Sequence, residues 1–89
     1  MRQATIKLYQ RVALTRDLPE HNLCKGDVAV VVEHLPGTLA SGGEAGYALE
    51  VFNAVGETIT VIMVPVSAVK SLTEHEIFKV RPLSITEPH

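Results

Sequence analysis

The chain is poor in cysteine and in aromatic residues. Cys24 is its single cysteine, tryptophan is absent, and two tyrosines and two phenylalanines are its aromatic residues. One cysteine excludes an internal disulfide and fits a reducing, cytoplasmic compartment. Four aromatic residues that are not interleaved with arginines provide little for stacking on bases, so we do not expect a nucleic-acid partner.

Long apolar runs and an excess of charge are also missing. The longest apolar run, VIMVPV, is far shorter than the roughly 20 residues that span a bilayer. The N-terminal sequence MRQATIKLYQRVAL has no apolar segment of the kind found in signal peptides. The net charge of -2 gives no basic surface for phosphate backbones or anionic lipids. These absences predict a cytoplasmic protein that does not bind membranes.

The composition that remains is that of a small folded domain. Of the 89 residues, 46% are hydrophobic and 20% are charged, which is enough apolar surface to form a core. This length allows one domain, and we assign it to residues 1–89, with a structural core at about 9–83 and a C-terminal tail at 84–89.

Five short segments are rich in β-branched residues or alternate between apolar and polar residues, which predicts strands. They are residues 11–16, 27–34, 47–53, 58–64 and 76–83. Their connections are a polar loop at 17–26, a glycine-rich loop at 35–46, a tight hairpin at 53–57 and a single helical turn within 66–72. This order predicts an all-β fold, a small five-stranded SH3-like barrel with one short helical turn before the last strand.

Alternation within the strands predicts which side chains face outward. We place Val28, Val30 and Val32 on the inner face together with Tyr47, Leu49 and Val51. Both faces of 58–64 are apolar, which is unusual for a strand with one face in water. The apolar excess is covered either within the chain or by a second copy or partner protein. The predicted interaction surface consists of Leu18, His21, Leu23, Val31, Phe52, Ile62 and Val64.

Several motifs occur in one order along residues 9 to 83. They are Asp17, Leu18, Pro19, Gly26, Asp27, Val31, Val32, Glu33, Tyr47, Glu50, Phe52, Gly56, Thr58, Val80 and Arg81. In this order the chain resembles a family of short bacterial proteins of unknown function. Leu49 departs from the valine usual in that family, and Ala29 stands where a second glycine is common. The resemblance implies an SH3-like fold, no known activity, and an accessory or antitoxin-like role beside toxin-like or enzyme genes.

Two groups of residues are candidates for chemistry. His21 and Cys24 are three apart in the first loop, but a structural zinc site needs four ligands and a thiolate nucleophile needs a base and an oxyanion site. Glu33 and Glu50 lie in mid-strand, and the simpler interpretation is an outer-face ion pair with Arg11, Lys79 or Arg81. We therefore predict no catalytic, cofactor-binding or metal-binding residue.

These observations favour a non-catalytic protein–protein interaction module that binds a partner or itself. Two other hypotheses stay open: a nucleic-acid-binding SH3-like barrel, and a small enzyme that uses His21 and Cys24 or Glu33 and Glu50.

Overall fold

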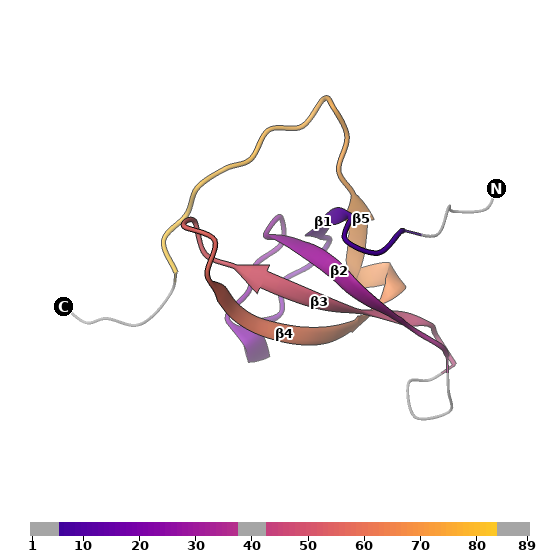
Figure 1. The fold of residues 1–89 in the computed structure, drawn as a ribbon. Helices are drawn as coiled ribbons and strands as arrows, with labels where there is room; N and C mark the ends of the chain where they lie inside the picture. Colours follow the sequence, from indigo (N-terminus) through magenta and orange to yellow (C-terminus); the bar gives the residue numbers. More distant parts are fainter. Residues whose placement is uncertain (1–5, 38–42, 84–89) are drawn as a thin grey trace.

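All strands of the computed structural model, which describes residues 6–37 and 43–83, belong to one antiparallel sheet (Figure 1). The strands are β1 (Arg11–Leu14), β2 (Val28–Leu35), β3 (Gly46–Phe52), β4 (Thr58–Pro65) and β5 (Val69–Ser71). Two 3-10 turns accompany them, η1 (Pro19–His21) and η3 (Val66–Ala68). No helix in the described ranges is long and apolar enough to cross a membrane.

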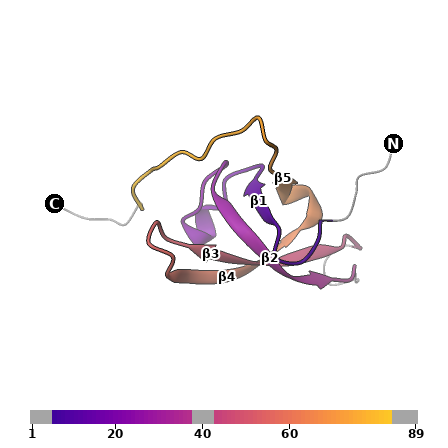
Figure 2. The ribbon, with the colours of Figure 1, turned by 45° about the horizontal axis from the view of Figure 1, so that its top comes forward.

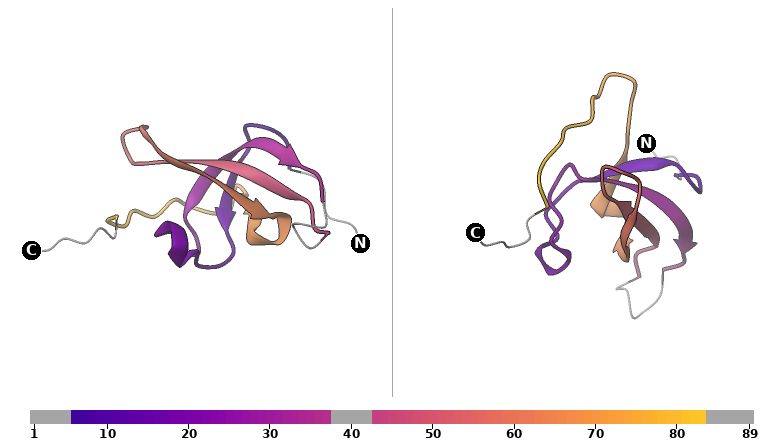
Figure 3. Two further views of the ribbon diagram at one scale, coloured as in Figure 1. Left: turned by 90° about the horizontal axis from the view of Figure 1, so that it is seen from below. Right: turned by 60° about the vertical axis from the view of Figure 1, so that its left-hand side comes forward.

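The strands lie in the order β4-β3-β2-β1-β5, and the turn η3 directly precedes the last strand, where the sequence predicted a helical turn. The all-β prediction is therefore confirmed. The long strand β2 pairs with β1 along its first residues and with β3 along most of its length. Figures 2 and 3 show the sheet curling between the β3–β4 pair and the β1–β5 pair. In the described residues β4 and β5 remain edges, so hydrogen bonds do not close the barrel.

The fifth strand is β5, and the prediction of a strand at 76–83 is wrong. β1 has two edges, and β2 occupies one of them. The turn η3 brings the chain directly to the other edge, where Val69 pairs with Leu14. Residues 76–83 therefore meet no free edge of β1, and they run on without joining the sheet. Part of the predicted loop 35–46 and all of the predicted tail 84–89 lie outside the described residues.

The core lies on the inner face of the curled sheet. Leu49, Val12 and Val31 are its largest fully buried side chains. The other buried members of this cluster come from every strand, from the first loop, from η3 and from the segment before β1: Ile6, Leu14, Leu18, Leu23, Ala29, Tyr47, Val51, Ile62, Val64, Ala68 and Val69. Burial of apolar surface of this kind is the main favourable term in folding.

On β2 the predicted facing is reversed. Val31 pairs with Leu49 and is fully buried, whereas its neighbour Val30 pairs with Glu50 and is only half-buried. A β-bulge between Val31 and Glu33 explains the error. The extra residue in the bulge reverses the alternation, so Glu33 lies on the face opposite to that of Val31. The charge of Glu33 therefore does not indicate that the Val31 side chain is exposed.

On β4, the two residues that we placed on the predicted interaction surface, Ile62 and Val64, face inward. Ile62 and Val64 are buried because they pair with Leu49 and Tyr47, which hold the inner face of β3. Val61 and Met63 point outward and are 56% and 71% exposed. Because both faces of this strand are apolar, its own alternation does not decide which one is inside.

The first loop folds back on itself. Leu18 and Leu23 form an isolated bridge, and Asn22 between them adopts a left-handed conformation with φ 59°. Both leucines point into the core. Gly26 has φ 94°, a conformation that side chains disfavour, and the next residue begins the approach to β2. The turn at Gly26 and Asp27 therefore leads directly into β2, which begins at Val28.

The facing of β2 is tested by a pair of matched substitutions. We expect Val31→Ala to lower the free energy of unfolding by about 2 kcal/mol, because it leaves a cavity in the core. Val30→Ala removes the same atoms at a half-buried site, and we expect a loss below about 1 kcal/mol. Urea unfolding followed by circular dichroism measures both, and a larger loss for Val30→Ala would show that the register is wrong.

Candidate functional site

The first pair of candidate residues, His21 and Cys24, lies in the loop before β2. His21 ends the turn η1 and is exposed, whereas Cys24 is half-buried and its backbone N–H donates to Asp27. No hydrogen bond joins the two side chains within the described ranges. In the same residues, no group of three or more His, Cys, Asp and Glu side chains is arranged to hold a metal ion.

The second pair, Glu33 and Glu50, lies on adjacent strands without facing each other directly. Glu33 is opposite Ala48, and Glu50 is opposite Val30. The Glu50 carboxylate accepts a hydrogen bond of 2.5 Å from the Thr58 hydroxyl. Neither carboxylate forms an ion pair with a lysine or arginine in the part of the chain that the structure describes, so the predicted ion pair is not observed there.

Most of the predicted interaction surface is buried. Five of its seven residues belong to the core, and their predicted exposure is wrong: Leu18, Leu23, Val31, Ile62 and Val64. His21 and Phe52 are exposed, and their role in binding stays a prediction.

The outer face of the β3–β4 half carries a different set of exposed apolar side chains. Phe52, Val61 and Met63 share this face by strand alternation, and we call them the β3–β4 apolar patch. Phe52 is 38% exposed. The patch borders β4, whose second edge has no paired strand within the described residues. An apolar patch beside an open edge is a feature of surfaces that bind other proteins.

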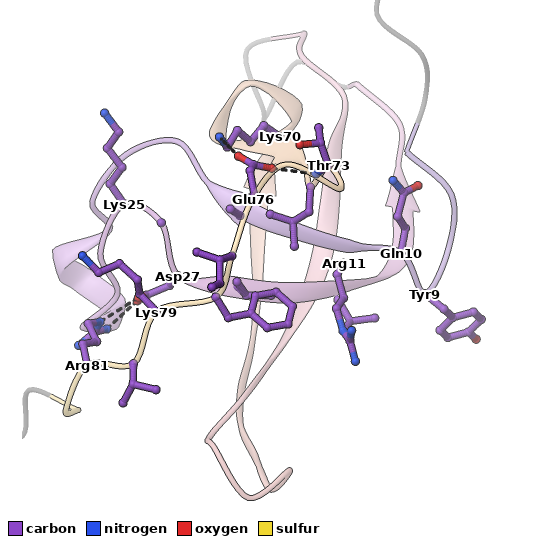
Figure 4. Close-up of a pocket in the computed structure, with 18 residues that line it drawn as sticks. Tyr9, Gln10, Arg11, Lys25, Asp27, Lys70, Thr73, Glu76, Lys79 and Arg81 are labelled. Atoms are coloured by element: carbon purple, nitrogen blue, oxygen red, sulfur yellow. Dashed lines mark hydrogen bonds and ion pairs between the residues drawn. The ribbon is translucent and has the colours of Figure 1, made fainter.

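A second feature is the segment 72–83, which we call the C-terminal arm. It leaves β5 and arches over the outer face of β1 and β2 toward the β3–β4 hairpin (Figures 1 and 4). Two ion pairs hold it. Glu76 accepts from the Lys70 ammonium at 2.6 Å, and this bond lowers the pKa of Glu76, helped by the Thr73 N–H.

The farther ion pair joins Arg81 to Asp27, two residues that lie 54 positions apart in the sequence. Arg81 donates through Nε at 2.8 Å and through Nη2 at 2.6 Å, one bond to each carboxylate oxygen. Asp27 also accepts the Cys24 N–H at 2.8 Å. Partial burial raises the pKa of Asp27, but the hydrogen bonds from Arg81 and Cys24 outweigh it and leave this pKa below its ordinary value. The hydrogen bond between Arg81 and Asp27 also raises the pKa of Arg81.

Between the arm and the sheet lies a groove of about 970 Å³ (Figure 4). Side chains of β1 and β2, including Arg11, Ala13 and Val30, form the floor of the groove. Residues of the arm form its wall. The Arg11 guanidinium lies 5.7 Å from the centre of the Phe78 ring, a cation–π contact that links floor and wall. The arm groove was not predicted, because 76–83 was assigned to the sheet. The sequence signal for this ion pair is the opposite charge of Asp27 and Arg81, but no local sequence pattern indicates that these two residues meet.

Comparison with known protein families gives a match over most of the chain. Residues 8–71 match the domain of unknown function DUF4926, so the chain belongs to the DUF4926 family. The matched region begins just before β1 and ends with the last residue of β5. The C-terminal arm, with Val80 and Arg81, lies outside it. No curated protein and no solved structure matches the chain.

The attachment of the arm is tested by Arg81→Gln, which removes the charge and keeps much of the side-chain length. We expect the free energy of unfolding to fall by about 1–2 kcal/mol, since a charge-assisted bidentate bond is lost at a half-buried site. We also expect faster amide hydrogen exchange at Asp27 and its neighbours. Lys7→Gln, at an exposed site that bears no ion pair in the described residues, is the control and should change neither quantity. An arm variant that matches this control would show that the ion pair does not hold the arm.

The same ion pair has a definite pH dependence. Since the pKa of Asp27 is lower in the folded state than its unperturbed value of 3.8, its contribution to stability is complete above that value. It is lost as the pH falls below 3.8 and through the folded-state pKa. We therefore expect wild type and Arg81→Gln to differ in unfolding free energy at pH 6 and to converge in acid. A difference that persists unchanged in strong acid would contradict this assignment.

Proposed function

We propose that the protein is a non-catalytic protein–protein interaction module, an accessory or antitoxin-like partner that acts in the cytoplasm. The observation that carries the proposal is the outer side of β4, where an open strand edge and the β3–β4 apolar patch lie together. A partner that binds here gains backbone hydrogen bonds from the edge and apolar burial from the patch.

The sequence of β4 supports this use of its edge. The strand reads TITVIMVP and contains no charged residue. Natural proteins commonly protect an edge strand with lysine, with an inward-pointing charge or with a bulge. Here a bulge at Ile59 and a proline at Pro65 flank the open stretch, and nothing within it repels another strand.

The position of the reactive residues supports a role without catalysis. His21 is exposed on a 3-10 turn, and its side chain forms no hydrogen bond with a nearby thiol or carboxylate in the described ranges. Activation of a cysteine or a water requires such a bond between base and nucleophile. Glu50, bonded to Thr58 on the sheet surface, has no second acid directly opposite it.

The proposed surface is tested by the double variant Val61→Lys, Met63→Lys. We expect the tagged wild-type chain, purified from its host, to retain a partner protein or to elute as a dimer. We expect the double variant to lose this association, because two charges would have to be buried against the partner. Co-purification followed by multi-angle light scattering measures both outcomes.

The control for this experiment places lysine at another exposed apolar residue. Val55 lies at the tip of the β3–β4 hairpin and is 79% exposed. We expect Val55→Lys to keep the association. A wild-type chain that is monomeric and carries no partner, or a double variant that still associates, would overturn the proposal.

The enzyme hypothesis is tested in the first loop, at its candidate nucleophile Cys24. We expect the variant Cys24→Ser, which removes the candidate nucleophile, to bind the partner as tightly as wild type and to unfold at nearly the same urea concentration. Titration by isothermal calorimetry measures the affinity. An identified activity of the wild-type chain that Cys24→Ser lacks would favour catalysis.

A further inference from the structure

We propose that the arm groove is a second binding site, and that its ligand is an extended, acidic segment of a protein. No residue of β3 or β4 lines this groove. The inference therefore stands independently of the surface proposed above.

Charge is distributed unevenly between the groove and the rest of the chain. Five of the chain's eight lysines and arginines line the groove: Arg11, Lys25, Lys70, Lys79 and Arg81. Only two of its ten acidic residues, Asp27 and Glu76, do so. The groove thus has a formal charge of +3, and the remaining residues together carry -5. A cationic groove on an acidic chain selects an anionic ligand that contacts the groove and little else.

Three of the five cations are available to a ligand. Arg81 and Lys70 already pair with carboxylates of the groove. Arg11, Lys25 and Lys79 form no ion pair with any described residue, and the Arg11 guanidinium lies over the Phe78 ring. Figure 4 shows Lys25 and Lys79 near the Asp27–Arg81 end of the groove, and Arg11 toward the other end beside Tyr9. The unpaired charges therefore lie along the groove and not at one point, as an extended ligand requires.

The backbone and the apolar lining favour a peptide. Residues 77–80 of the arm form no backbone hydrogen bond with another described residue, so their N–H and C=O groups are available for pairing with an added strand. Val28 and Val30 on the floor, with Ile77 and Val80 on the arm, supply apolar contacts for alternate side chains. Ile77 and Val80 are 88% and 92% exposed, so the arm buries little of its own apolar surface.

A nucleic acid fits these observations less well. Its phosphates continue beyond the groove, where they would meet the surface that carries -5. A short acidic segment ends before that surface. Stacking of bases would depend on Tyr9 and Phe78, the two aromatic residues that line the groove.

The test uses the full chain and a fluorescein-labelled peptide of about eight alternating Glu and Val residues, which spans roughly 26 Å when extended. We expect fluorescence anisotropy to show saturable binding that weakens as salt is raised. Matched peptides with Gln or Lys in place of Glu should not bind. An oligothymidylate of similar length and charge is the nucleic-acid comparison.

Three variants locate the binding. We expect Lys79→Glu and Lys25→Glu each to weaken binding of the Glu–Val peptide roughly tenfold. Lys7→Glu makes the same change of charge outside the groove, and we expect less than about a twofold effect. The variant Val61→Lys, Met63→Lys should bind the peptide normally, which separates this site from the β3–β4 apolar patch. Circular dichroism confirms that each variant is folded.

The outcomes that overturn the inference are specific. They are no binding of the Glu–Val peptide by wild type, equal weakening by Lys7→Glu and Lys79→Glu, and tighter binding of the oligothymidylate than of the peptide. Amide shifts on peptide titration give a second readout. Shifts at Val30 and Val80 support the site, and shifts confined to Val61 and Met63 contradict it.

Discussion

The register between β2 and β3 is the constraint on which the rest of the structure depends. Val31 pairs with Leu49 and Ala29 pairs with Val51, and all four side chains are buried. This pairing fixes the inner face of the sheet and, through β3, decides that Ile62 and Val64 of β4 also point inward. A slip of one residue would exchange the two faces of a strand and place buried valines in water. The exposed patch and the arm groove are both consequences of this one alignment.

Much of the fold could be predicted from the sequence, because segments rich in β-branched residues are separated by glycine and proline. The first four strands and the helical turn before the last strand follow from those signals, whereas the order of the strands within the sheet was not predicted. The position of the fifth strand was not predicted correctly. The pattern at 76–83 shows that a segment is suited to an extended conformation, but it does not show which strand edge the segment reaches. β5 occupies the edge of β1, and residues 76–83 pair with neither of the edges that stay open in the described residues.

The candidate site was less predictable for a related reason. The bulge at Val31–Glu33 exists only in relation to the partner strand, so neither the sequence of β2 nor its charge at Glu33 reveals it. The bond between Asp27 and Arg81 spans 54 positions and obeys no local rule. His21 and Cys24 were candidates because they are close in sequence, but no hydrogen bond joins their side chains in the described ranges.

The open edge of β4 limits the concentration at which the chain stays in solution by itself. An uncharged strand edge with apolar neighbours is a template on which identical chains can add in either direction. Above some concentration, collisions between two such edges become more frequent than encounters with a binding partner. A protein that pairs with β4 would therefore raise the yield of soluble chain on co-expression, whereas overproduction of the chain alone would favour aggregation.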